Sequence, residues 1–176
     1  MKLSALFGQR PGFGFVDDRG APNAYATSDT LVPGTWGTVL YGATLFRQTL
    51  AAYDDGGMAV MAVMAHEFGH VAQFAYGLDR RLLQGQATVK RVELHADYLA
   101  GWYLGRRKAE QPELSVWAAG DMLAGIGDYA FFDWNHHGTP EERVAAAEAG
   151  FKLAGDGQAD FDPAVERGLE FVLANA

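Results

Sequence analysis

The chain has 176 residues, of which 49% are hydrophobic, and it carries a formal net charge of −8 with no cysteine. This length and apolar content suffice for one domain with its own core, which we expect to span residues 1–176. The lack of cysteine excludes disulfides and thiolate-ligated metal. The acidic balance argues against a nucleic-acid partner, because binding to a phosphate backbone requires clustered lysine and arginine.

The beginning of the chain is expected to be irregular. Glycine and proline recur from the start, and we expect no regular structure before about residue 33, then one or two strands within residues 35–41 and a helix over residues 43–53. Residues 1–15 lack the apolar run of a signal peptide, and the apolar run 58–65 is far shorter than the roughly 20 residues of a membrane span. We therefore expect a cytoplasmic protein without an integral membrane segment.

The next segment, residues 57–76, predicts a buried helix with a metal-binding pattern. It is rich in alanine, methionine, valine and phenylalanine, lacks proline and contains the sequence His66-Glu67-Phe68-Gly69-His70. Histidines four residues apart project from one side of a helix, so both can reach one ion at about 2.0–2.1 Å. Glu67 lies at the edge of that face, where it can hold a water molecule without ligating the ion. Because buried polar groups need partners, a metal ion is the simplest common partner for all three.

A second helix, from residue 88 to about residue 108, is predicted by apolar residues at three- and four-residue steps. Glu93 and Asp97 share one face of it. Their spacing allows Glu93 to ligate the metal and Asp97, one turn later, to accept the N–H of a ligating histidine. The alternative is that both are solvated surface acids. His95 faces away from them and is not predicted to be a ligand.

Three further helices are expected: from residue 115 to about 128, from Pro140 onward, and from Pro163, introduced by Asp162. Thr139 is a favourable N-cap for the second of these, with Pro140 at the first helical position and Glu142 completing a capping box. A loop just before this helix therefore carries His136 and His137. We expect His137 to reach the cleft and to donate a hydrogen bond to an oxyanion. The alternative is that both histidines are ordinary polar loop residues.

The sequence HEFGHVAQ (residues 66–73), followed by VELHADYLAG (residues 92–101), resembles the gluzincin metallopeptidases. The similarity is greatest to the neutral zinc metallopeptidase family, with its HExGHxxQ and ELxADxxAG segments, and extends more distantly to heat-shock membrane proteases and CAAX prenyl proteases. This resemblance implies a zincin-like fold and a catalytic Zn²⁺. It assigns the metal ligands as His66, His70 and Glu93, the catalytic base as Glu67 and the support of a ligand as Asp97.

Other segments extend the resemblance. Residues 22–26 and 37–42 resemble elements that precede the HExxH motif in the broader group, where the second element forms a sheet edge beside the active-site cleft. This resemblance implies that the backbone of Thr38, Val39 and Leu40 binds an extended substrate. The alternative is an ordinary hairpin strand. Residues 136–143 resemble the late His-Gly-Ser/Thr-x-x-x-Arg segment of the neutral metallopeptidases.

Together these patterns predict a mostly helical α+β single domain with a small sheet beside the HExxH helix. The expected function is zinc-dependent hydrolysis of peptide bonds in a peptide or unfolded protein, with Glu67 as general base and no nucleic-acid partner. The alternative is a catalytically silent module that is stabilised by zinc and holds peptides.

Overall fold

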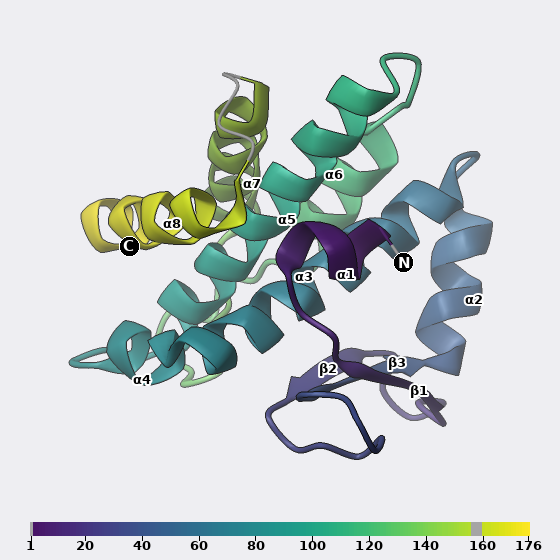
Figure 1. Cartoon of the computed structure of the whole chain (residues 1–176). Helices are drawn as coiled ribbons and strands as arrows, with labels where there is room; N and C mark the ends of the chain where they lie inside the picture. Colours follow the sequence, from purple (N-terminus) through teal and green to yellow (C-terminus); the bar gives the residue numbers. More distant parts are fainter. Residues whose placement is uncertain (1, 156–159) are drawn as a thin grey trace.

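The computed structural model describes residues 2–155 and 160–176. The fold is α+β and mostly helical, as predicted, and Figure 1 shows the sheet on one side of the long helices. The elements in chain order are α1 (Lys2–Phe7), β1 (Gly12–Val16), β2 (Ala24–Thr27), β3 (Thr38–Gly42), α2 (Ala43–Ala52), α3 (Gly56–Tyr76), α4 (Leu78–Leu83), α5 (Lys90–Glu110), α6 (Trp117–Gly125), α7 (Pro140–Gly155) and α8 (Phe161–Asn175).

The sheet is mixed, in the order β1-β3-β2. The central strand β3 pairs in parallel with β1 and antiparallel with β2. The prediction that Thr38, Val39 and Leu40 form a sheet edge is therefore wrong, because both sides of β3 are already hydrogen-bonded. In the described sheet β2 is an outer strand, and it packs against α3, the helix that carries the HExxH motif.

The irregular N-terminal stretch is also a wrong prediction, since it contains α1, β1 and β2. The strands are short, and β1 has the glycine-rich sequence GFGFV with Phe13 and Phe15 about half exposed. Such a strand lacks the alternation of buried β-branched residues by which strands are recognised. Its two phenylalanine rings instead pack edge to face with each other.

The helix α3 is the central element of the core. It contacts the sheet, α2, α5 and α6, and most of its residues are buried. This burial on nearly every side explains why the segment is apolar around its whole circumference. The metal-binding pattern therefore lies inside the protein.

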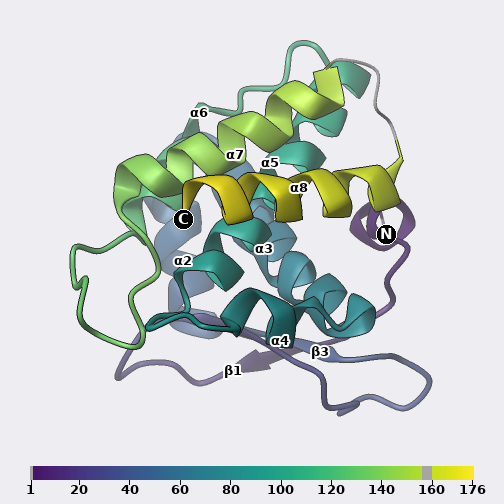
Figure 2. The same ribbon diagram turned by 90° about the vertical axis from the view of Figure 1, so that its left-hand side faces the viewer.

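The helices α5, α7 and α8 form the layer on the other side of α3. Contact between α5 and α7 is very close, because a Cβ atom at Gly101 would overlap the backbone of Ala147 and one at Gly150 would overlap the backbone of Tyr98. In Figure 2, α8 passes in front of α5 and lies below α7, and it is in contact with both helices. The glycines allow the middle of α7 to come close to the middle of α5.

The predicted helices after the motif are present with changed ends. The capping box is confirmed, because the Thr139 N–H donates to Glu142 Oε2 at 2.9 Å and the Glu142 N–H donates to Thr139 Oγ1 at 3.3 Å. The helix expected to end near residue 128 ends at Gly125, and the C-terminal helix begins at Phe161 rather than Pro163. Because α6 ends at Gly125, Asp128 lies in the loop that follows, where its N–H donates to the Gly138 carbonyl.

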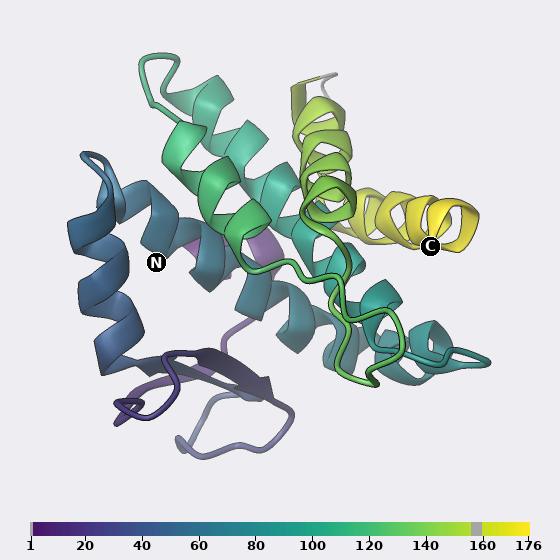
Figure 3. The ribbon, with the colours of Figure 1, turned by 180° about the vertical axis from the view of Figure 1, so that it is seen from behind.

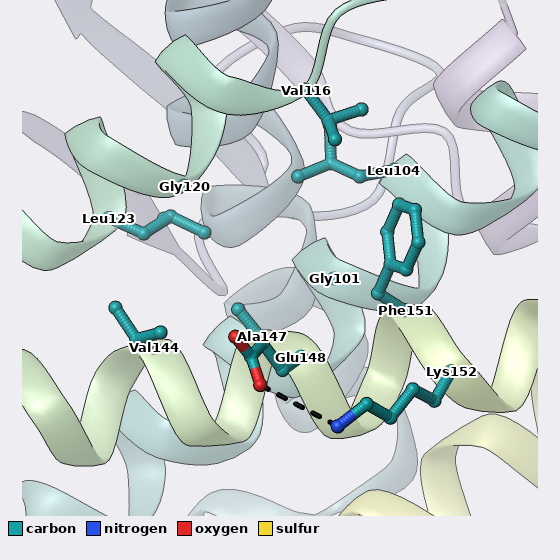
Figure 4. Close-up of a pocket in the computed structure, with 10 residues that line it drawn as sticks. All are labelled: Gly101, Leu104, Val116, Gly120, Leu123, Val144, Ala147, Glu148, Phe151 and Lys152. Carbon is teal, nitrogen blue, oxygen red and sulfur yellow. Dashed lines mark ion pairs between the residues drawn. The ribbon is translucent and has the colours of Figure 1, made fainter.

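An apolar cavity of about 400 Å³ lies between α5, α6 and α7 (Figure 4). Its lining includes Leu104, Leu123 and Phe151, and its charged groups are Glu148 and Lys152, which form an ion pair at 3.6 Å. It shares no lining residue with the histidine site described below. In the described part of the chain, no helix combines the length and apolar character needed to cross a membrane.

Candidate metal centre

The three predicted metal ligands converge at one point. The Nε2 atoms of His66 and His70 lie 3.0 Å apart, and the Glu93 carboxylate lies 3.3 Å from the first and 3.5 Å from the second. One donor atom from each residue lies within 4.8 Å of the others. Because α3 supplies both histidines and α5 supplies the carboxylate, the group depends on close packing of these helices. A Cβ atom at Gly69 would lie only 3.0 Å from Ala96 Cα, so glycine permits this approach.

Asp97 holds the imidazole of His66. Its Oδ1 atom lies 2.8 Å from His66 Nδ1, and Asp97 is fully buried, so it is not a solvated surface acid. A carboxylate accepts hydrogen bonds, so His66 carries its proton on Nδ1 and directs the lone pair of Nε2 toward His70 and Glu93.

Gln73 holds the imidazole of His70 in the same way. The Gln73 amide group Nε2 donates to the Val92 carbonyl at 2.7 Å, which leaves Oε1 to accept the proton of His70 Nδ1 at 3.0 Å. The lone pair of His70 Nε2 therefore also points at the common centre. Gln73 is the last residue of the HExGHxxQ pattern, and its contact with His70 was not predicted from the sequence.

Two lone pairs 3.0 Å apart beside a carboxylate repel one another unless a cation lies between them. The set of two imidazole nitrogens and one carboxylate oxygen therefore fits a metal ion. Without a metal, a proton takes this place. Burial alone lowers the pKa of His66, but the carboxylates of Asp97 and Glu93 outweigh it and raise that pKa to about 10.

The pKa values of Glu93 and Glu67 are also shifted from their ordinary range. Burial raises the pKa of Glu93, but the facing imidazoles of His70 and His66 outweigh it and hold the pKa well below its usual range. Burial raises the pKa of Glu67, which is 6% exposed and lies outside the ligand group. Glu67 therefore has the position that the sequence predicts, beside the ligands without being one of them.

Arg143, in the first turn of α7, supplies the buried positive charge of the site. It is 1% exposed, donates to Asp97 Oδ1 at 2.9 Å and lies 3.7 Å from Glu93. In the sequence this arginine stands out only as the last residue of the His-Gly-Ser/Thr-x-x-x-Arg segment. Its position three residues after Pro140 at the start of a capped helix was the available signal for a role near the cleft.

A cavity of about 500 Å³ opens beside the ligand group. Glu67 and the three ligands line it on one side, and the segment 22–26, which includes part of β2, lines it on another. Thr38, Val39 and Leu40 are not among its lining residues, so the strand at the cleft is β2 and not β3. Apolar lining comes from Leu45, Val63, Phe74, Val92, Met122 and Ile126.

His137 lines the same cavity, and Asp128 holds it there. The His137 N–H donates to Asp128 Oδ2 at 2.9 Å, and the same oxygen lies 3.2 Å from His137 Nδ1. The neighbouring His136 is buried, with its Nδ1 atom 2.5 Å from Asp128 Oδ1, so only His137 is directed at the cavity. In Figure 3 the connection between α6 and α7, which carries both histidines, lies with the sheet in the lower half of the view. Asp128 was not predicted from the sequence.

In comparison with known proteins, no protein family, curated protein or solved structure matches this chain.

Proposed function

We propose that this protein is a zinc-dependent peptidase. The observation that carries the proposal is the convergence of two imidazole nitrogens and a carboxylate in a cavity wall, with the buried carboxyl group of Glu67 beside them. Two histidines and a glutamate are a ligand set of catalytic zinc sites, which leave one coordination position open. A bound zinc ion supplies Lewis acidity, which polarises a carbonyl and makes water acidic enough to act as a nucleophile near neutral pH.

Glu67 acts as the general base in this proposal. Its carboxylate accepts a proton from the attacking water and then delivers that proton to the leaving amine. Burial raises its pKa, which brings its proton affinity closer to that of the groups with which it exchanges the proton. His137 donates a hydrogen bond to the oxygen of the tetrahedral intermediate, with Asp128 holding the ring.

The proposed substrate is an extended segment of a peptide or unfolded protein. Within the described sheet β2 pairs on one side only, with β3, and its residues line the cavity. An edge strand offers backbone N–H and C=O groups to an added strand regardless of its sequence. The apolar side chains of the cavity would then receive the substrate side chains.

The test compares wild type with Glu67→Gln on unfolded protein substrates, with zinc measured in both proteins. The variant keeps the shape of the side chain and removes the proton acceptor, so zinc content should persist while hydrolysis falls about 100-fold or more. Glu148→Gln, at an exposed position in α7, is the matched control and should retain full activity.

Two outcomes would overturn the peptidase. A Glu67→Gln variant with wild-type turnover would exclude Glu67 as the base. A wild type that binds peptides as tightly as the variant but cleaves none of them would replace the enzyme with the zinc-stabilised peptide-binding module.

A further inference from the structure

A buried chain of hydrogen bonds leads from the candidate metal centre to the C-terminal helix. It begins at His70, whose Nδ1 atom lies 3.0 Å from Gln73 Oε1. The amide group of Gln73 lies 3.1 Å from His95 Nδ1, and His95 Nε2 lies 3.1 Å from the carbonyl oxygen of Val165 in α8. Gln73 and His95 are both fully buried. These two links of the hydrogen-bond chain are therefore shielded from bulk water.

The carbonyl groups along this chain determine the direction of every hydrogen bond. The Val165 carbonyl can only accept, so His95 carries its proton on Nε2 and presents the lone pair of Nδ1 to Gln73. The Gln73 amide uses one proton for this lone pair and the other for the Val92 carbonyl. Only Oε1 remains for His70, which must then hold its proton on Nδ1 and offer Nε2 to a metal.

The fit between His95 and α8 depends on Gly168. A Cβ atom at this position would lie 2.9 Å from Tyr98 Cδ1 and 3.1 Å from His95 Cδ2. Both distances are shorter than ordinary van der Waals contact. A side chain at this position would therefore push the rings of His95 and Tyr98 away from α8.

We propose that Gln73 and His95 are positioning residues that fix the tautomer and ring plane of His70, and that they couple α8 to the metal centre. This inference rests on the proposed zinc site. None of the described residues that line the cavity belongs to α8, so this helix can affect the metal centre only through other residues. Partners that orient a ligating histidine typically contribute 10–100-fold to metal affinity.

The first experiment measures zinc affinity by chelator competition in Gln73→Met and Gln73→Glu. Methionine preserves the volume but removes the acceptor for His70, so affinity should fall about 10–100-fold. Glutamate retains an acceptor for the His70 N–H while lacking both amide protons, so its loss should be several-fold smaller than that of methionine. Unfolding midpoints of the metal-free variants report any general loss of stability.

The second experiment changes a residue of α8. Gly168→Ala should displace the His95 ring and weaken zinc binding several-fold, although it lies outside the cavity. The matched control is Gly120→Ala in α6, where an added Cβ atom meets no atom within 4 Å. Because alanine favours a helix, the control should keep or raise stability and leave zinc affinity unchanged.

A third measurement distinguishes an error in the proposed hydrogen-bond chain from an error in the proposed metal centre. Nitrogen NMR of the imidazoles should show His95 with its proton on Nε2 in wild type, with or without zinc, and with mixed tautomers in Gln73→Met. Wild type that binds no zinc but keeps this His95 tautomer would overturn the metal centre alone. Wild-type zinc affinity in both Gln73→Met and Gly168→Ala, or a His95 proton on Nδ1, would overturn the proposed coupling.

Discussion

At the scale of single residues, the site is distinguished by charges that are buried together. Asp97 and Glu93 face Arg143 on one side and two imidazoles on the other, and Asp97 and Arg143 are almost entirely removed from water. Groups of this kind are stable only when each has its partner, because an unpaired buried charge is costly.

The pair formed by Arg143 and Asp97 can be tested by removing its members. Arg143→Met should lower the unfolding free energy of the metal-free protein by about 3–5 kcal/mol, because it removes the buried guanidinium that pairs with Asp97 and Glu93. Asp97→Asn should cost a similar amount, and the double variant should cost clearly less than the sum. Arg167→Met, which breaks an exposed pair with Glu170, should cost no more than about 1 kcal/mol. Strictly additive losses in denaturant unfolding would show that the two side chains are independent.

Metal binding should release a proton near neutral pH. Asp97 and Glu93 raise the pKa of His66 to about 10, so the metal-free ring is charged at pH 7 and must lose its proton before Nε2 can bind a metal. Zinc affinity should therefore rise with pH from 6 to 9, and about one proton should leave for each zinc bound. Calorimetry in two buffers with different ionisation enthalpies measures this number. Equal heats in both buffers would mean that the His66 ring is already neutral.

At the scale of elements, the links between the sheet and the helices matter most. The buried carboxylate of Asp18 accepts the N–H groups of Thr44 and Leu45 at 2.6 and 3.0 Å, and that of Asn23 at 3.2 Å. It therefore joins the first turn of α2 to the segment before β2. This arrangement fixes one end of the strand that lines the cleft.

This link should make stability depend on pH in the acid range. Burial raises the pKa of Asp18, but the N–H groups of Leu45 and Thr44 outweigh it and lower the pKa to about 2, below the ordinary 3.8. A depressed pKa contributes stability that is complete above pH 4 and disappears as the pH falls through 2. The unfolding free energy of wild type should therefore fall more steeply between pH 4 and 2 than that of Asp18→Asn. Parallel curves for the two proteins would remove Asp18 as the source.

At the scale of the whole molecule, the sequence predicted those parts of the site that lie on one helix face. Helical periodicity places His66 with His70 on one face of α3, and Glu93 with Asp97 on one face of α5, but it does not show that the two faces meet. That they meet was implied by the resemblance to the gluzincin metallopeptidases. Partners from other elements have no such periodicity, so the contacts of Arg143 and Asp128 could not be derived. The strands β1 and β2 were missed because they are short and half exposed, and the pairing order that places β2 at the edge follows from tertiary structure.

The position of Arg143 in the chain has a consequence for biosynthesis. The ligands are complete once residue 93 has emerged from the ribosome, but the guanidinium that balances Asp97 and Glu93 is supplied 50 residues later, by α7. Until then the two carboxylates lack their arginine partner, and α5 lacks the helix that packs most closely against it. In a nascent chain the arrangement of Glu93 and Asp97 should therefore form only after α7 has folded onto α5.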